Sequence, residues 1–419
     1  MNRAAGQPSD GAAALAGSRR AARARTTCTH ARAGPSWSFR ASSAGLIAII
    51  ILSIGAAAVA QAQPPIRVGA SVSQTGAYAL LGQNQLRGYQ LCIKHTNGIY
   101  ERLIAQDRVD LVFSPYGTPI TEPVADVTEK YRMPLVSPIA AASSMYKKGR
   151  KFLLMLPSPG EVYLGGLIDL AARHGLKTLA LINEDTLFPK TAVKGATDLA
   201  RRKGLQVVFA EAYPKGTTDF SAILTRVRTV NPDVLGAATF FDDAVAISRQ
   251  MKEVNVNPRM YGVTVGGALP RFYELLGRGA EFVYGASPWE PELVTLRAGG
   301  LIPVARQYPG AREFVESHNK EYPGADLSYH SAAGYGACQI LVEAIRRVGS
   351  LDGRKIRNAI LKMDLNTVYG GFRVDEDGFQ IAHKMVTIQW QDGKKAIVWP
   401  EELAPGKPRF PTPPWSQRP

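Results

Sequence analysis

The segment Asp219–Ala237, DFSAILTRVRTVNPDVLGA, combines the two building blocks that decide the fold. Its first half is an amphipathic helix whose apolar residues share one face: Phe220, Ile223, Leu224, Val227 and Val230. The second half is the short apolar run Val234–Ala237, which is typical of a strand buried in a parallel sheet. The segment therefore predicts one helix–strand unit of an α/β fold.

The same alternation extends on both sides of this segment. Short apolar strands separated by amphipathic helices are predicted at Ile66–Ser71, Val109–Phe113, Pro134–Ser137, Thr178–Ile182, Gln206–Ala210, Val234–Ala237, Met260–Val265 and Phe282–Ala286. After residue 288 the pattern changes to two long helices, Ala311–Tyr322 and Ser331–Val348, and then to hairpin signals around Asp375–Gly378 and Asp392-Gly393. We expect parallel sheets covered by helices, with antiparallel strands added by the C-terminal part of the chain.

Length and charge limit the alternatives. A chain of 419 residues is longer than one hydrophobic core usually organises, and 45% apolar residues can fill two cores, so two lobes are expected. The net charge of +15 falls to +9 once residues 1–62, with seven Arg and one Asp, are set aside. The remaining basic residues form short groups at predicted helix surfaces with few aromatic residues between them, so nucleic-acid binding is disfavoured.

The beginning of the chain predicts export. Gly45–Ala60, GLIAIIILSIGAAAVA, is shorter than a bilayer-spanning helix, and Ala60-Gln61-Ala62 offers small residues for cleavage. We interpret residues 1–62 as a leader and signal peptide that direct the protein to the periplasm, with a start codon downstream of Met1 as one possibility. An uncleaved membrane anchor is the alternative.

The sequence lacks the familiar signatures of enzymes. It has no G-x-S-x-G, no H-E-x-x-H, no P-loop and no dinucleotide fingerprint, so we expect no catalysis, cofactor or catalytic residue. Cys92 and His95 make at most half a metal site, and we expect none. For Cys92 and Cys338 we favour two buried small side chains over a disulfide bond.

The loops after the strands carry the candidate binding residues, because ligands of such sheets bind beyond the carboxyl ends of the strands. Aromatic residues gather there: Tyr78, Tyr116, Phe188, Phe240, Phe241 and Trp289. Thr118-Pro119 is typical of a helix N-cap followed by proline, which leaves backbone N–H groups free for a carboxylate. Each feature also has a plain structural interpretation, as a loop anchor or an ordinary cap.

Four segments together resemble the type I periplasmic solute-binding proteins, in the branched-chain-amino-acid (leucine/isoleucine/valine-binding) group. They are Ile66–Gly82 (IRVGASVSQTGAYALLG), Val109–Ser143, Asp219–Leu235 and Ser328–Ile360. The resemblance implies two Rossmann-like lobes that are joined by three hinge crossings near Pro157, Pro288 and Met363. It also implies a protein that closes on a small ligand and presents it to the permease subunits of an ABC transporter in the inner membrane.

The resemblance further implies domain boundaries and site residues. Lobe I would comprise residues 63–157 and 289–363, lobe II residues 158–288 and 364–402, and a Pro-rich C-terminal tail residues 403–419. The ligand-binding positions carried over by motif are Tyr78, Gly117, Thr118, Ala140, Ala141, Phe188, Phe241 and Val265. No metal and no cofactor are implied.

Two departures from the family pattern affect these expectations. Val265-Gly266-Gly267 lacks the carboxylate that holds the ammonium group of an amino acid, so an acid-only, even aromatic, ligand becomes competitive unless Asp185, Asp242 or Asp243 substitutes. The second strand of the first lobe, an edge strand, is missing between Gly98 and Ile99. The predicted function is capture of an amino acid or related carboxylate for import; a ligand sensor or a weakly binding paralogue is the alternative.

Overall fold

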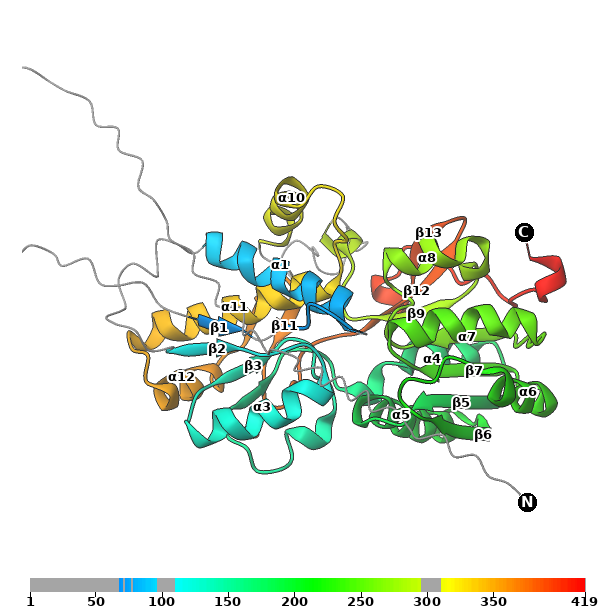
Figure 1. Ribbon diagram of the computed structural model, residues 1–419, viewed down its shortest axis with the longest axis horizontal. Helices are drawn as coiled ribbons and strands as arrows, with labels where there is room; N and C mark the ends of the chain where they lie inside the picture. Colours follow the sequence, from blue (N-terminus) through cyan, green and yellow to red (C-terminus); the bar gives the residue numbers. More distant parts are fainter. Residues whose placement is uncertain (1–67, 71, 77, 96–109, 295–309, 419) are drawn as a thin grey trace, which may run out of the picture. The chain divides into compact units, whose positions relative to one another are not determined.

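A computed structural model of the chain describes residues 68–70, 72–76, 78–95, 110–294 and 310–418. For residues 92–95 it describes the backbone alone. The leader and the junction Gly98-Ile99 thus lie outside the described residues. Pairing and packing place the described elements in two groups, which we call lobe I and lobe II (Figure 1).

Lobe II is built on one seven-stranded sheet with the order β13-β12-β9-β8-β7-β5-β6. Five of its strands are parallel, and the hairpin β12–β13 adds antiparallel to β9. Their bounds are β5 Thr178–Glu184, β6 Gln206–Tyr213, β7 Val234–Ala238, β8 Met260–Val263, β9 Tyr284–Ser287, β12 Val386–Gln391 and β13 Lys394–Trp399. In the hairpin turn, Asp392 and Gly393 both have positive φ, as a type I′ turn requires.

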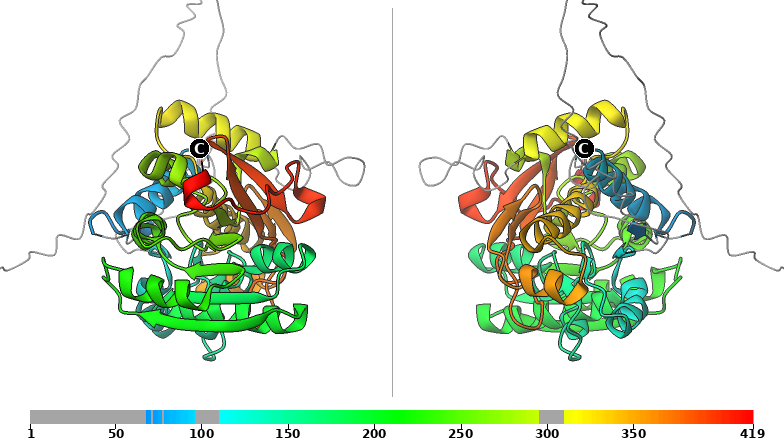
Figure 2. Two further views of the ribbon diagram at one scale, coloured as in Figure 1. Left: turned by 90° about the vertical axis from the view of Figure 1, so that its right-hand side faces the viewer. Right: turned by 90° about the vertical axis from the view of Figure 1, so that its left-hand side faces the viewer.

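Helices cover both faces of this sheet, which is why its central strands are apolar throughout. Leu179 and Leu181 of β5 pack with one set of helices, whereas Ala180 and Ile182 belong to the core on the other face. The first set is α4 Gly165–Arg173 and α5 Leu187–Lys203; the second is α6 Ser221–Val230, α7 Phe241–Glu253 and α8 Pro270–Leu276. Figure 2 shows the sheet between these layers.

Lobe I has much shorter strands. β1 Val68–Ala70 pairs in parallel with β2 Leu111–Phe113, and β3 Leu135–Ser137 pairs in parallel with β4 Leu153–Met155. Its helices are α1 Ala79–His95, α3 Thr118–Lys130, α10 Ala311–Glu321, α11 Tyr329–Val348 and α12 Gly353–Ile360. Among the described residues, β1 has no partner other than β2, the next strand in the chain.

The main internal contact of lobe I joins α1 to α11 through glycines. A Cβ at Gly88 would lie 2.0 Å from the carbonyl oxygen of Ser331, and one at Gly334 would lie 2.5 Å from that of Gln85. Only glycine permits the two helix backbones to approach so closely. Gly88 and Gly334 therefore allow α1 and α11 to pack backbone against backbone.

We propose that the chain crosses between the lobes after β4 and after β9, as expected near Pro157 and Pro288, because β4 pairs with β3 whereas β5 and β9 belong to the seven-stranded sheet. For the third crossing the contacts favour a later position than Met363. The strands β10 Leu365–Thr367 and β11 Gly370–Phe372 pair with each other, and the backbone N–H of Met155 donates to the carbonyl of Gly378 at 2.8 Å. We propose that this segment belongs to lobe I and that the crossing lies just before β12.

All eight strands predicted from the sequence correspond to strands of the structure, whereas β4 was not predicted. The expectation of two unbonded cysteines was wrong for Cys338, which is buried and disulfide-bonded. The side chains of the other cysteines, Cys28 and Cys92, lie outside the description. Among the described residues, no helix is long and apolar enough to cross a membrane.

Candidate functional site

The carboxyl ends of strands from both lobes face a small buried cavity. Its volume is about 10 Å³, close to the space of a single water molecule. Nine residues from seven separate stretches of the two lobes line it: Tyr116, Gly117, Thr118, Ile139, Tyr163, Phe188, Phe240, Val265 and Tyr329. A ligand of amino-acid size requires the walls to move apart.

Gly117 and Thr118 bring the start of α3 to this cavity. Gly117 is the N-cap residue, with φ +78°, a conformation that favours glycine. The prediction of Thr118 as the N-cap was therefore wrong by one residue, since Gly117 makes the turn into the helix. Thr118 instead opens the helix, and its hydroxyl makes no capping hydrogen bond. This hydroxyl is left available to a molecule in the cavity.

Aromatic rings form a continuous row across the cleft. Tyr78 of lobe I lies 5.8 Å from Tyr116 and 5.1 Å from Phe240 of lobe II, between ring centroids. Phe240 lies 5.9 Å from Phe188, and Phe188 lies 5.0 Å from Tyr163, the last pair edge to face. The rings of Tyr116, Phe240, Phe188 and Tyr163 give the cavity apolar walls.

Four buried hydroxyl groups, three on residues that line the cavity and one on Tyr78 next to them, have no hydrogen-bond partner within the described protein. They are Tyr78 Oη, Tyr116 Oη, Thr118 Oγ1 and Tyr329 Oη. Burial raises the pKa of Tyr116 and of Tyr329 well above the ordinary value for tyrosine, so both phenols stay protonated and can donate. Buried polar groups are nearly always paired in folded proteins, so these hydroxyls are available to form hydrogen bonds with water or with a polar ligand.

Carboxylates lie beside the row of rings, on lobe II. Glu184 ends β5, is buried, and accepts a hydrogen bond from Thr186 Oγ1 at 2.7 Å. Asp243, in the first turn of α7, accepts one from Tyr213 Oη at 3.0 Å. Burial, chiefly, raises the pKa of Asp243 to about 6, and the charge of Glu184 adds to the effect.

The structure brings together four of the eight predicted site residues, since Gly117, Thr118, Phe188 and Val265 all line the cavity. Tyr78 lies one ring further out, in contact with Tyr116 and Phe240. The other three are buried but do not line the cavity: Ala140, Ala141 and Phe241. Their role in binding stays a proposal.

The backbone of Ala140 and Ala141 is largely engaged within the protein. The N–H of Ala140 donates to Ser137 Oγ at 3.1 Å, and its carbonyl accepts from Tyr146 Oη at 2.8 Å. The carbonyl of Ala141 accepts from the backbone N–H of Gly160 at 2.7 Å, next to the first crossing. These residues hold the loop between β3 and η1 (Ser143–Met145) in place behind the cavity.

Five lining residues were absent from the predicted set. Tyr116 and Phe240 had been noted as loop aromatics, so their loop position was the available signal. Tyr329 lies at the start of a helix, and its neighbour Ser328 began one of the resembling segments. Tyr163 and Ile139 gave no signal, because apolar residues near strand ends are ordinary core residues.

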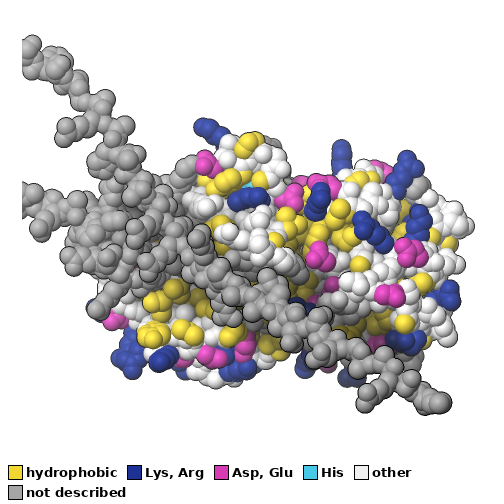
Figure 3. All heavy atoms as spheres, viewed as in Figure 1, with side chains coloured by type: hydrophobic (Ala, Val, Ile, Leu, Met, Phe, Trp, Pro, Cys, Tyr) yellow, Lys and Arg dark blue, Asp and Glu magenta, His cyan; other side chains and the backbone are white. Residues whose placement is uncertain are grey.

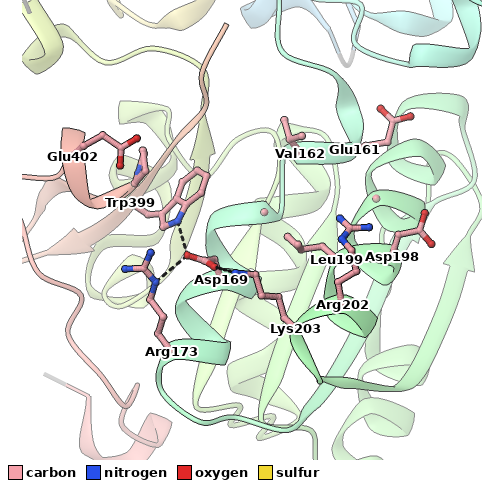
Figure 4. Close-up of a pocket in the computed structure, with 13 residues that line it drawn as sticks. Glu161, Val162, Asp169, Arg173, Asp198, Leu199, Arg202, Lys203, Trp399 and Glu402 are labelled. Atoms are coloured by element: carbon pink, nitrogen blue, oxygen red, sulfur yellow. Dashed lines mark hydrogen bonds and ion pairs between the residues drawn. The ribbon is translucent and has the colours of Figure 1, made fainter. Parts of the chain in front are cut away.

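A larger hollow lies on the outer side of lobe II, between α4, α5 and the end of β13, and is shown in Figure 4. Its charges are mutually satisfied around Asp169, which pairs with Lys203 at 2.5 Å, with Arg173 at 3.0 Å and with the indole N–H of Trp399 at 3.0 Å. Within the described residues, no group of His, Cys, Asp and Glu could hold a metal ion. Basic and acidic side chains are interspersed on the face seen in Figure 3.

A two-lobed α/β protein whose strand ends enclose a small cavity has the architecture of a solute-binding protein. Residues 98–395 match the family model described as periplasmic binding protein, so the chain belongs to that family, in its type I, branched-chain-amino-acid group. The family consists of solute-binding proteins, and the chain is a binding protein rather than an enzyme.

Relatives and solved structures agree with this assignment. The Leu/Ile/Val-binding protein homolog 7 of Brucella melitensis is 23% identical over 404 residues, which cover 87% of this chain and 99% of the relative. Homolog 8 of Brucella suis is 22% identical, with 86% and 96% covered.

Among solved structures, the leucine-binding protein LivK of Thermotoga maritima superposes with a TM-score of 0.67 at 20% identity, covering 80% of this chain and 97% of that one. A solute-binding protein of R. palustris in complex with benzoate gives a TM-score of 0.68 at 14% identity, covering 80% and 96%. At these identities the likeness shows the fold.

Proposed function

We propose that this protein is the periplasmic solute-binding component of an ABC importer and captures an amino acid or a related small carboxylate, aromatic ones included, between its two lobes. The observation that carries the proposal is the cluster of four buried hydroxyls without partners. A hydroxyl donor has its strongest available partner in a carboxylate, because hydrogen bonds to charged groups are about twice as strong as neutral ones.

In this proposal the two lobes contribute different groups to the binding site. Lobe I supplies the hydroxyls of Tyr116, Thr118 and Tyr329, together with the first turn of α3, whose free N–H groups favour an anion. Lobe II supplies Phe188 and Phe240 as apolar walls for the rest of the ligand. The related proteins support this assignment, since they include Leu/Ile/Val-binding protein homologues and a solute-binding protein in complex with benzoate.

Binding then requires hinge motion. A cavity of about 10 Å³ admits no amino acid, so the row of rings between Tyr78 and Phe188 must separate and re-form over the ligand. Closure of this kind is a standard response of periplasmic binding proteins and would present the closed form to permease subunits in the inner membrane. Export by the leader would place the protein in the periplasm.

Calorimetric titration of the purified protein tests the proposal. The panel contains leucine, isoleucine, valine, phenylalanine and the acids benzoate and 3-phenylpropanoate, and we expect saturable one-to-one binding of at least one member. Bound ligand should also raise the melting temperature, because it binds only the folded state. Absence of both heat and melting shift across the whole panel would overturn the proposal.

A further inference from the structure

A tight turn between β6 and α6 carries Lys215 at the edge of lobe II, because β6 is an edge strand of the sheet. In this turn, the backbone N–H and the hydroxyl of Thr217 both donate to the carbonyl of Pro214, at 3.2 Å and 2.6 Å. Gly216 has φ +86° and occupies the position where a type II turn requires a positive φ. The turn thus has a defined backbone geometry, with the exposed Lys215 at its first corner.

Hydrogen bonds connect both ends of this turn to α7. Before the turn, the hydroxyl of Tyr213 donates to Asp243 at 3.0 Å. After the turn, the side chain of Gln250 donates to the carbonyl of Thr218 at 2.8 Å and accepts from the backbone N–H of Phe220 at 2.5 Å. Because both anchors belong to one helix of lobe II, we expect the turn to move together with lobe II.

The ammonium group of Lys215 lies over an aromatic ring of lobe I. Its nitrogen is 5.0 Å from the centre of the Tyr78 ring, within the roughly 6 Å at which a cation is attracted by an aromatic face. Tyr78 lies between β1 and α1, directly before the first residue of that helix, so it belongs to lobe I. The contact therefore joins the two lobes on the solvent side of the cleft.

Tyr78 also has contacts at the cavity itself. Its ring centroid is 5.1 Å from that of Phe240 in lobe II and 5.8 Å from that of Tyr116 in lobe I, and both of these residues line the cavity. Lobe II thus contacts the Tyr78 ring from two places, through Phe240 at the cavity and through Lys215 from the solvent side. Because a cavity of about 10 Å³ releases nothing of amino-acid size while it is closed, a ligand can leave only after the lobes separate and both contacts break.

We propose that the contact between Lys215 and Tyr78 holds the two lobes closed over the ligand, so that Lys215 slows ligand release without touching the ligand. This inference rests on the proposed function. Lys215 does not line the cavity, so it is a positioning residue that acts through the ring of Tyr78. A ligand enters before the lobes close, whereas it leaves after they open. Loss of the contact should therefore accelerate dissociation and leave association unchanged.

Stopped-flow mixing measures the two rate constants separately. The purified protein is mixed with leucine, phenylalanine or benzoate, and intrinsic fluorescence follows binding and release. We expect Lys215→Met to raise the dissociation rate constant about two- to fivefold, the effect of one cation–aromatic contact at an exposed site, and to leave the association rate constant unchanged. Lys215→Arg keeps the cation and should release ligand at the rate of the unmodified protein.

Two further variants test whether the effect depends on the ring. Tyr78→Leu removes the partner of the cation, so adding Lys215→Met to it should change the dissociation rate constant no further. Lys252→Met is the matched control. Lys252 is also an exposed lysine of lobe II, in the last turn of α7, whereas Phe240 at the cavity precedes the first turn of that helix. Its replacement removes the same charge and should change neither rate constant.

Nuclear magnetic resonance detects the contact itself, with or without ligand. Reductive methylation with ¹³C-formaldehyde labels the lysines and keeps their charge, and the Lys215 signal is the one missing from the Lys215→Met protein. A methyl group over an aromatic face is shifted upfield by the ring current, so we expect an upfield signal from Lys215. In the Tyr78→Leu protein this signal should return to the position of the other lysines.

The outcomes separate the two proposals. A Lys215 signal that coincides with those of the other lysines in the ligand-saturated protein, or a Lys215→Met protein that releases ligand at the unmodified rate, would overturn the role of Lys215 and leave the proposed function standing. Failure of every compound of the calorimetric panel to bind would overturn the proposed function and the role in release with it, whereas an upfield Lys215 signal would then still support the contact between the lobes.

Discussion

The two lobes share an α/β plan but are held together differently. Lobe II has a seven-stranded sheet whose strands are four to eight residues long, with a helix layer on each face. Each strand pair of lobe I is three residues long, and the close contact of α1 with α11 connects its helices. The first lobe therefore depends on helix packing where the second depends on its sheet.

The same division appears in the site. The unpartnered hydroxyls in and next to the cavity, on Tyr116, Thr118, Tyr329 and Tyr78, all belong to lobe I. Lobe II contributes the rings of Phe188 and Phe240 and the carboxylates. Lobe I, whose strands are shorter, thus carries the hydroxyls that lack hydrogen-bond partners in the ligand-free protein. We therefore expect ligand binding to stabilise lobe I more than lobe II.

The largest expected effect comes from a buried ion pair next to the second crossing. Lys395 of β13 pairs with Glu290, which is 1% exposed, and also donates to the carbonyl of Ala268 at 3.1 Å. Lys395→Met leaves a buried carboxylate without its partner and should lower the free energy of unfolding by about 3–5 kcal/mol. Urea denaturation measures this loss.

Lys194→Met is the control for that variant. Lys194 forms the same kind of pair with Asp198, but on the exposed surface of α5, so its replacement should leave the denaturation midpoint unchanged. Equal effects of the two variants would show that burial does not distinguish the pairs.

The second prediction concerns a substitution that destabilises lobe I alone. Gly88→Ala puts a Cβ 2.0 Å from a backbone oxygen of α11, so the two helices must separate, at a cost of about 3 kcal/mol. Gly165→Ala in α4 of lobe II is the control, because the nearest atom to its Cβ is a Leu199 methyl carbon at 3.8 Å. Limited proteolysis should cut the Gly88→Ala protein first within lobe I; cleavage confined to lobe II would contradict the comparison.

The third prediction separates binding from stability. Thr118→Val and Tyr329→Phe each remove a hydroxyl that has no partner in the ligand-free protein, so the melting temperature should stay level or rise. Ligand affinity should fall about tenfold to a hundredfold, since a hydrogen bond to a charged group is lost. Phe188→Leu, which alters a lobe II wall without a polar atom, provides the comparison by calorimetry. A parallel fall in melting temperature would indicate a structural role for the hydroxyls.

The smallest effect concerns pH. Burial lowers the pKa of His330 in lobe I to about 3, and chiefly burial lowers that of His383 near the third crossing to about 4. Both pKa values lie below 6.5, the ordinary value that histidine has in the unfolded chain. The stability that depends on these neutral histidines is therefore fully present above pH 6.5 and is lost as the pH falls toward 4. In that range each histidine should lower the free energy of unfolding by about 1.4 kcal/mol for each pH unit. Melts between pH 7.5 and 5 measure this slope, and His330→Phe should reduce it; an unchanged slope would exclude His330.

Much of the fold was readable from the sequence, because periodic burial leaves a periodic pattern. The run Val234–Ala237 and the helix stripe from Phe220 to Val230 were both predicted within a few residues. β4, Leu153–Met155, was not predicted, since a three-residue strand leaves no periodic pattern. Our proposal that residues 364–380 belong to lobe I rests on a hydrogen bond to β4, which local sequence preference does not reveal.

The site shows the same limit. The family resemblance implied Tyr78, Gly117, Thr118 and Phe188, and their loops follow predicted strands, where ligands of such sheets bind. It gave no reason to include Tyr163, and it could not show which hydroxyls lack partners, since a hydrogen bond is a relation between distant residues.

By itself, then, the sequence determined the order of strands and helices and the loops that could meet a ligand, since burial and turn formation act locally. The tertiary structure alone decided that Gly117 and not Thr118 makes the turn into α3, which hydroxyls are left unpaired, and that Lys215 lies over the ring of Tyr78. The turn at Gly117 is a local backbone conformation that the residue types did not distinguish from a cap at Thr118. The other two properties depend on distances between segments far apart in the sequence, which folding alone brings into contact.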